Sequence, residues 1–340
     1  MKSIPVNAEH LYEVDFVESW SNAIVESIAD RPAVVIFPSS LKSVVPALPS
    51  SLHHVEVPDG ESQKSLESFG RVLNEIANLG MTRQGLILGV GGGATTDLAG
   101  YVAASYLRGI DWIAVPTSLA GMVDAAIGGK TGINLNAGKN LAGAFHSPRK
   151  VIIDEHFLST LSERDIKAGM AEVAKCGFIS DIHILDLIEK GWRENISELI
   201  FRAVTVKANV VTNDFRESFE REVLNYGHTL GHAIERESGY ELRHGEAVSI
   251  GLNYAAALSV RFSGLSENEY KRHINILELL DLPTRYPRDK WSALLSVMQN
   301  DKKKRDHLRF VTLSILGNPT RLENIETTDL QSIYEEVVGR

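Results

Sequence analysis

The stretch Gly85–Leu107, GLILGVGGGATTDLAGYVAASYL, indicates the fold class of this chain. Its apolar beginning predicts a buried strand over residues 85–90. A glycine-rich turn follows between Gly89 and Ala94, and the alanine-rich segment 95–107 predicts a helix. Strand, glycine-rich turn and helix in this order are typical of α/β domains in which a dinucleotide pyrophosphate lies at the helix start. We therefore predict a Rossmann-like α/β domain around this stretch.

The glycine-rich turn also has a simpler interpretation, and it lacks one expected neighbour. A tight turn that requires glycines with positive φ would show the same local sequence. The next predicted strand, residues 111–115, ends in Pro116-Thr117-Ser118 and not in the acidic residue that usually binds the nucleotide ribose. We expect a bound nucleotide to fix its ribose elsewhere, for example through Glu61 and Lys64.

The remainder of the first half alternates short apolar runs with helical segments. Strands are predicted at residues 33–37, 53–57, 85–90, 111–115 and 151–154, and helices at residues 65–79 and 95–107. These strands lack polar alternation, which favours a mostly parallel sheet covered by helices on both faces.

Residues 124–140 show little periodicity, and we interpret them as a loop region. Lys130 and Lys139 lie beside glycines there and suit a phosphate or carboxylate group, although surface lysines on a solvated loop are the alternative. The sequence GGKT lacks the spaced first glycine of a Walker loop. Arg108, at the end of the predicted helix, is either a partner of the helix dipole or an anion ligand.

The second half is predicted to be helical. Helical periodicity covers residues 163–178, 183–190, 196–214, 228–237, 246–262, 267–280 and 290–300, and only residues 308–316 have a strand pattern. We therefore predict an α/β domain over residues 1–158 and an all-helical domain over residues 159–340.

Composition excludes several classes of protein. The chain has 340 residues and a net charge of −9, which argues against nucleic-acid or anionic-membrane binding. Its one cysteine, Cys176, allows no intramolecular disulfide, fits a reducing cytoplasm and is expected to be a small buried residue. The sequence contains no apolar run of signal-peptide or transmembrane type.

The stretch Leu224–Glu246, LNYGHTLGHAIERESGYELRHGE, carries three of the chain's eleven histidines. His228 and His232 are four residues apart, so a helix places them on one face, and His244 follows after a glycine break. Three imidazoles can then converge on a metal ion or act in proton transfer, whereas ordinary surface or core histidines are the alternative.

Glu172 and Lys175 lie one helical turn apart in GMAEVAKCG. Such a pair is usually a weak surface ion pair. The small apolar residues around it make burial plausible, and a buried carboxylate requires a partner or a metal ion. Glu172 is then the natural third ligand beside His228 and His244, since two histidines and one carboxylate form the ligand set of a catalytic zinc ion.

Several stretches together resemble 3-dehydroquinate synthase, of the sugar-phosphate cyclase group. The resemblance covers about residues 58–312 and rests on GVGGGATTDLAGYVAASYLRG, VPTSLAGMVDAAIGGKTGIN, GKNLAGAFHSP, GMAEVAKCG, LNYGHTLGHAIE and RHGEAVSIG in this order. It implies a lyase that depends on NAD and on Zn²⁺ or Co²⁺ and acts as a cytoplasmic homodimer in the shikimate pathway. Its substrate would be 3-deoxy-D-arabino-heptulosonate 7-phosphate, and its products 3-dehydroquinate and phosphate.

The resemblance also implies roles for individual residues. The metal ligands would be Glu172, His228 and His244. His232 would be a polar group that faces the substrate or a proton-transfer group, and not a ligand. Positions that match substrate-binding or catalytic residues are Asp124, Lys130, Asn140, Lys175, Lys207, Arg221, Asn225 and Lys303, with Lys302 adjacent to the last. Arg108 matches an arginine that reaches the phosphate site of the neighbouring subunit. Positions that match NAD contacts are Glu61, Lys64, Gly91, Gly92, Gly93, Asp97, Thr117, Ser118, Lys130, Lys139, Phe157, Thr160 and Leu161.

Two departures from the family concern the nucleotide. Phe37-Pro38-Ser39-Ser40 stands where many members carry an acidic residue after the first strand, and Ser118 replaces a threonine. The implied chemistry is transient oxidation by NAD, phosphate elimination, re-reduction and intramolecular aldol closure. The alternatives are another sugar-phosphate cyclase, a metal-dependent polyol dehydrogenase and a non-catalytic protein on the same fold.

Overall fold

The computed structural model describes residues 2–45, 48–49, 52–216, 220–302 and 308–339. The chain divides into two compact units, Met1–Leu161 with Lys207–Arg216, and Ser162–Val206 with Glu217–Arg340. The helix α6 (Ile196–Asn213) contributes residues to both units, because the boundary between Val206 and Lys207 lies within it.

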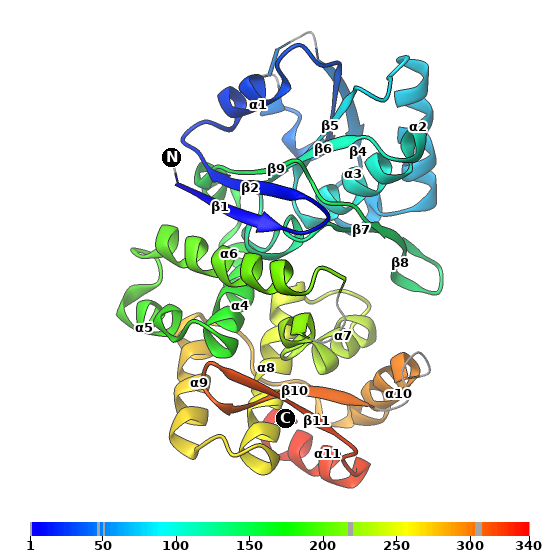
Figure 1. Ribbon diagram of the computed structural model, residues 1–340. Coiled ribbons are helices and arrows are strands. Elements are labelled where there is room, and N and C mark those ends of the chain that lie inside the picture. The colour runs from blue at the N-terminus through cyan, green and yellow to red at the C-terminus, as the bar shows by residue number, and fades with distance from the viewer. Residues whose placement is uncertain (1, 46–47, 50–51, 217–219, 303–307, 340) are drawn as a thin grey trace. The chain divides into compact units, whose positions relative to one another are not determined.

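The first unit is built on a seven-stranded sheet with the order β1-β2-β9-β6-β5-β3-β4 (Figure 1). The β1–β2 pair is antiparallel and every other pairing is parallel, which confirms the predicted mostly parallel sheet. The strands are β1 (Lys2–Asn7), β2 (Leu11–Phe16), β3 (Ala33–Pro38), β4 (His53–Val57), β5 (Leu86–Gly91), β6 (Asp111–Pro116) and β9 (Lys150–Ile153). The helices α1 (Trp20–Ile28), α2 (Leu66–Asn78) and α3 (Gly93–Ser105) pack against it.

The central strands follow directly from their sequence. Every residue of β3 (AVVIFP) and of β5 (LILGVG) is buried. A strand that is covered on both faces needs a continuous apolar run, and this is the pattern that identified these strands. Because β5 and β6 are parallel neighbours, the glycine-rich turn after β5 and Thr117-Ser118 after β6 lie at the same edge of the sheet.

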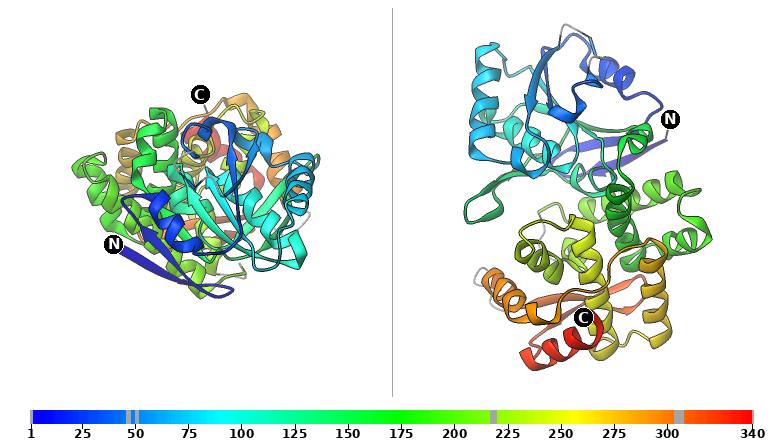
Figure 2. Two further views of the ribbon diagram at one scale, coloured as in Figure 1. Left: turned by 90° about the horizontal axis from the view of Figure 1, so that it is seen from above. Right: turned by 180° about the vertical axis from the view of Figure 1, so that it is seen from behind.

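Two hairpins and one helix of this unit were not predicted. The β1–β2 hairpin and α1 went unassigned, and the interpretation of residues 124–140 as a loop region is wrong. Most of that region forms β7 (Lys130–Leu135) and the start of β8 (Gly138–Phe145), an antiparallel hairpin that projects from its unit (Figure 2). Gly132 pairs with Gly143, and a Cβ on Gly143 would lie 2.2 Å from the Thr131 carbonyl oxygen. Glycine carries little strand propensity, so the pattern was hidden.

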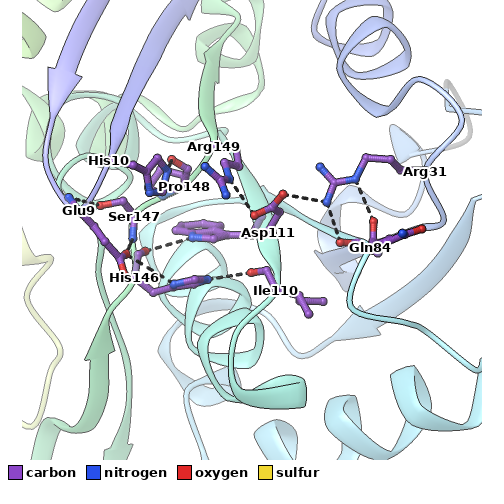
Figure 3. A network of polar contacts seen from close by, with 12 residues as sticks. Glu9, His10, Arg31, Gln84, Ile110, Asp111, His146, Ser147, Pro148 and Arg149 are labelled. Carbon is purple, nitrogen blue, oxygen red and sulfur yellow. Dashed lines mark hydrogen bonds and ion pairs between the residues drawn. The ribbon is translucent and has the colours of Figure 1, made fainter.

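Polar contacts join the β1–β2 turn to the segments that flank β6 and β9 (Figure 3). A carboxylate oxygen of Glu9 accepts a hydrogen bond from the Ser147 backbone N–H at 3.0 Å. Asp111, at the start of β6, accepts from Arg31 at 2.9 Å and from Arg149 at 2.7 Å. The Glu9 contact ties the β1–β2 turn to the segment before β9, and the Asp111 contacts join the start of β6 to the segments before β3 and β9.

The second unit is largely helical, as predicted, with one exception. Its helices are α4 (Glu163–Ile179), α5 (Ile182–Gly191), the first part of α6, α7 (His228–Glu237), α8 (His244–Phe262), α9 (Glu267–Leu279), α10 (Trp291–Lys302) and α11 (Thr327–Ile333). The exception is an antiparallel hairpin, β10 (Arg309–Ile315) and β11 (Asn318–Glu323), of which only the first strand was predicted. Tyr254, Trp291, Phe310 and Tyr334 pack together in its core.

Within the described residues, no helix is both long enough and apolar enough to cross a membrane. Cys176 is buried on α4, and its thiol lies 3.8 Å from the Ala203 carbonyl oxygen. This placement agrees with the expected structural role of the cysteine.

A buried histidine, His273, packs against two aromatic rings in the core of the second unit. The His273 imidazole stacks on Phe178 with ring centroids 3.6 Å apart, and its Nε2 lies 3.1 Å from the Tyr226 hydroxyl. His273 is fully buried, and burial lowers the pKa of this histidine from 6.5 to about 3. The imidazole is therefore neutral across the physiological pH range.

We expect His273→Phe to reduce the pH dependence of stability. Below pH 6.5 the unfolded chain binds a proton at His273 that the folded chain excludes, so this residue lowers the free energy of unfolding as the pH falls and has no such effect above pH 6.5. Between pH 7.5 and pH 5.5 the wild type should lose about 1.4 kcal/mol more than the variant. Urea unfolding of both chelator-stripped proteins measures this difference, and equal pH dependence would contradict the assignment.

Candidate active site

Three helices of the second unit carry the predicted metal ligands. Glu172 lies on α4, His228 begins α7 and His244 begins α8. The helices approach one another closely, since a Cβ on Gly245 would lie 1.8 Å from the Ala168 carbonyl oxygen and one on Gly251 would lie 1.9 Å from the Gly227 carbonyl oxygen. Glycine at these positions allows the three helices to meet at their backbones.

The three predicted ligands converge. The Nε2 atoms of His228 and His244 lie 3.4 Å and 3.2 Å from the same oxygen of Glu172. The other Glu172 oxygen contacts the Lys175 ammonium group. Glu172 is 1% exposed and Lys175 is 2% exposed, so this is a buried ion pair and not the surface pair that the spacing alone would suggest.

The donor set fits a divalent metal ion. One carboxylate and two imidazoles offer ligand atoms that lie within 4.8 Å of one another. Neither Glu172 oxygen accepts a hydrogen bond of ordinary geometry from the described residues, although both are buried. A buried carboxylate oxygen in this state requires another partner, and Zn²⁺ binds two histidines and one carboxylate with an open fourth position.

A further contact orients each imidazole. The Nδ1 atom of His228 lies 3.1 Å from the Tyr226 carbonyl oxygen, and the Nδ1 atom of His244 lies 3.1 Å from a carboxylate oxygen of Glu235. Hydrogen bonds at Nδ1 leave Nε2 available to a metal ion. Glu235 was missed in the sequence, although its position three residues after His232 on α7 places it near the same face.

The charges of the site favour metal binding at Glu172 and His228. Burial raises the pKa of Glu172, but Lys175 and His228 outweigh burial and hold that pKa well below its usual range. Burial and the charge of Lys175 lower the pKa of His228. Burial also opposes the charge of His244, but close contacts with the carboxylates of Glu172 and Glu235 raise its pKa to about 10. Metal binding therefore requires the release of a proton from His244.

His232 faces the same site without being one of its three ligands. Its ring centroid lies 5.2 Å from that of His228 and 5.9 Å from that of His244. The side chain is exposed, yet the surrounding protein and the two neighbouring imidazoles lower its pKa. An exposed neutral imidazole beside a metal site suits proton transfer.

The predicted anion-binding residues of the second unit precede α7. Arg221 and Asn225 lie in the 3₁₀ segment η7 (Glu220–Asn225). The Arg221 side chain is 1% exposed, which is unusual for a guanidinium group. Lys303 lies outside the described residues, and so does the side chain of Lys302.

The glycine-rich turn of the first unit fits a pyrophosphate. Gly91, Gly92 and Gly93 are absent from the glycines with positive φ, so the interpretation as a positive-φ turn is wrong. Glycine is instead required by space, since a Cβ on Gly91 would lie 2.4 Å from the Thr95 hydroxyl oxygen. Gly92 is the N-cap of α3 and offers no side-chain cap, which leaves the first N–H groups of the helix for an anion.

A second polar cluster contains four predicted residues, Glu61, Lys64, Asp97 and Asn140. Lys64 is 4% exposed, and its ammonium group lies 2.5 Å from both Asp97 and the Asn140 side-chain oxygen. Burial opposes the charge of Lys64, but Asp97 and Glu61 outweigh it and raise the Lys64 pKa, whereas burial raises the pKa of Asp97 to about 6. Asn134, which was not predicted, donates to Glu61 at 2.7 Å and accepts from the Asn140 backbone at 2.9 Å.

The other predicted residues of the first unit lie on several segments. The Lys207 ammonium group lies 2.5 Å from a carboxylate oxygen of Asp124.

Leu107, Arg108 and Gly109 have φ values of 49°, 67° and 115°, so Arg108 lies in a strained turn after α3 and not at the end of the helix. Lys130 begins β7, Lys139 lies in β8, Thr117 and Ser118 follow β6, Phe157 and Thr160 lie in the 3₁₀ segment Glu155–Thr160, and Leu161 follows it.

Comparisons with known proteins agree on one family. The family models described as 3-dehydroquinate synthase N-terminal and C-terminal match residues 54–168 and 169–304. A 3-dehydroquinate synthase of Saccharopolyspora erythraea is 44% identical over 96% of this chain and 90% of its own length. One of Paenarthrobacter aurescens is 49% identical over 84% of this chain and 80% of its own length.

A solved structure shares the fold of this chain. The solved structure of ValA, the 2-epi-5-epi-valiolone synthase of Streptomyces hygroscopicus subsp. jinggangensis, contains bound NAD⁺ and Zn²⁺. It is similar to this chain with a TM-score of 0.89 over 98% of each chain, at 24% identity. This likeness supports the fold alone.

Proposed function

The chain belongs to the 3-dehydroquinate synthase family, and we propose that it converts 3-deoxy-D-arabino-heptulosonate 7-phosphate into 3-dehydroquinate and inorganic phosphate. This is a carbon–oxygen lyase reaction of the shikimate pathway, which leads to the aromatic amino acids. The observation that carries the proposal is the buried convergence of Glu172, His228 and His244 in a chain of this family.

The proposed cofactors are NAD and a divalent metal ion, Zn²⁺ or Co²⁺. Glu172, His228 and His244 would hold the metal ion, whose Lewis acidity would act on substrate oxygens. The glycine-rich turn after β5 would hold the NAD pyrophosphate, and NAD would supply a reversible hydride acceptor. The remaining NAD contacts that we propose are Glu61, Lys64, Asp97, Thr117, Ser118, Lys130, Lys139, Phe157, Thr160 and Leu161.

The chain's own residues would bind and orient a substrate that carries a carboxylate and a phosphate. Cations suit both anionic groups, and buried cations act strongly because water screens them little. Arg221 and Lys175 are both at most 2% exposed. His232 would exchange a proton with the substrate from the open side of the metal site. The substrate-binding residues that we propose are Arg108, Asp124, Lys130, Asn140, Lys175, Lys207, Arg221, Asn225 and Lys303.

We also propose that the protein is a cytoplasmic homodimer. A chain with a single buried cysteine and no possible intramolecular disulfide suits a reducing compartment. The strained turn around Arg108 would present its guanidinium group to the phosphate site of a second copy. Sedimentation equilibrium of the purified protein tests the dimer.

The function is tested by phosphate release from the heptulosonate phosphate. We expect release and formation of 3-dehydroquinate in the presence of NAD and zinc, and loss of both after treatment with a chelator. NADH should not accumulate, because the reaction is redox-neutral overall. Stoichiometric NADH would identify a polyol dehydrogenase instead, and turnover of a different sugar phosphate would identify another cyclase.

A further inference from the structure

The β10–β11 hairpin presents two arginines to one carboxylate of η7. Arg309 pairs with Glu323 and Val311 pairs with Arg321 in its register, so Arg309 and Arg321 are diagonal neighbours on one face. This hairpin lies beyond residue 304, where the match to the family models ends. Its contacts with η7 therefore concern a part of the chain that the family match does not describe.

Glu222 is the carboxylate that receives these arginines. A guanidinium nitrogen of Arg321 lies 2.5 Å from one Glu222 oxygen, and one of Arg309 lies 3.8 Å from the other. The side chains of Glu222 and Arg321 are 10% and 22% exposed. A short, largely shielded contact of this kind restrains its partners more than an exposed surface pair does.

A second contact joins the same hairpin to the start of α7. The Thr229 hydroxyl donates a hydrogen bond of 3.0 Å to the Arg309 carbonyl oxygen. Thr229 follows His228, and Glu222 follows Arg221. The hairpin thus contacts the residues adjacent to a proposed metal ligand and to a proposed anion-binding residue.

The segment η7 depends on such contacts for its orientation. A 3₁₀ segment of this length has weak internal hydrogen bonds and is held mainly by its neighbours. Glu222 lies between the proposed substrate residues Arg221 and Asn225, so fixing its carboxylate restrains both of them.

We propose that Arg321, acting through Glu222, is a positioning residue for Arg221 and Asn225 in substrate binding. Arg321 itself contacts no substrate in this proposal. The inference rests on the proposed function, because Arg221 and Asn225 are taken as substrate-binding residues there. Loss of the contact should weaken binding of the sugar phosphate and leave the metal ligands in place.

The test compares Arg321→Met, Glu222→Gln and the double variant. We expect each to raise the KM for the heptulosonate phosphate by about 5- to 30-fold, with a smaller change in kcat and with the zinc content of the wild type. Because both substitutions break the same contact, the double variant should be no worse than the poorer single variant. Arg321→Lys keeps the charge, so its KM should lie between those of the wild type and Arg321→Met.

Arg272→Met is the matched control. Arg272 also binds carboxylates in the second unit, at 2.5 Å to Asp186 and 2.8 Å to Glu189, but it joins α9 to α5. We expect this variant to lower the melting temperature about as much as Arg321→Met and to leave the KM unchanged. The melting temperature therefore separates a loss of stability from a loss of positioning.

Three results would overturn the inference. They are an unchanged KM in Arg321→Met, an equal rise of the KM in Arg272→Met, and additive effects of Glu222→Gln and Arg321→Met. None of these affects the proposed function, which fails only if the wild-type protein releases no phosphate from the heptulosonate phosphate.

Discussion

His228→Ala and His244→Ala should each lose bound zinc and reduce turnover by about 10³-fold or more. Each substitution removes one of two imidazole nitrogens that lie within 3.4 Å of the buried Glu172 carboxylate. A zinc ion left with one histidine and one carboxylate is bound too weakly to survive dialysis. Metal analysis of the dialysed proteins and a phosphate-release assay measure both effects.

His183→Ala is the matched control for the histidine variants. His183 lies on α5 in the same unit, and its side chain is 45% exposed. Zinc content and turnover should be those of the wild type. Normal zinc content in both His228→Ala and His244→Ala would contradict the ligand assignment, whatever their activity.

Arg221→Ala and Lys130→Ala should lose about 10²- to 10³-fold in turnover while they retain zinc and NAD. Arg221 is fully buried, so its charge is poorly screened and acts strongly on a bound anion. Lys130 begins β7 and is exposed, so its ammonium group is accessible from solvent. Metal analysis, NAD titration and the phosphate-release assay separate substrate binding from cofactor binding.

Two further variants serve as controls for the Arg221→Ala and Lys130→Ala prediction. Arg221→Ala leaves a large cavity, so Arg221→Lys, which retains a charge, shows whether the loss of activity follows folding or the guanidinium group. Lys150→Ala serves as the lysine control, since Lys150 pairs with Asp15 at 2.7 Å in the sheet. Normal turnover in Lys130→Ala or Arg221→Ala would refute its role as an anion-binding residue.

The strands that could be predicted most directly are those that the protein buries on both faces. The strands β3 and β5 are buried on both faces, so their sequences are continuous apolar runs. The hairpin β7–β8 was missed because glycines at its closest approach carry no strand pattern. The helix α3 was predicted to run to Leu107, beyond its end at Ser105, since the positive φ values of Leu107 and Arg108 have no local sequence signature.

Some residues of the candidate site could be predicted from the sequence and others could not. The i,i+4 spacing of His228 and His232 and the small residues around Glu172 indicate chemistry within single helices. The contact of Glu235 with His244 and that of Asn134 with Glu61 join residues whose relative placement depends on tertiary packing. Spacing along the chain places Glu235 near the face of His232 but does not show which residue of another segment it contacts, so both residues were overlooked.

The close approach of α4, α7 and α8 has a consequence for mutational tolerance. Main-chain atoms of Ala168 and Gly227 lie where a Cβ on Gly245 or Gly251 would have to sit, so backbone contact sets the spacing of these helices. Exchanging apolar side chains nearby changes volume without moving the ligand-bearing backbones. A saturation library selected for zinc retention should therefore accept varied apolar residues around the site and reject every residue larger than glycine at these two positions.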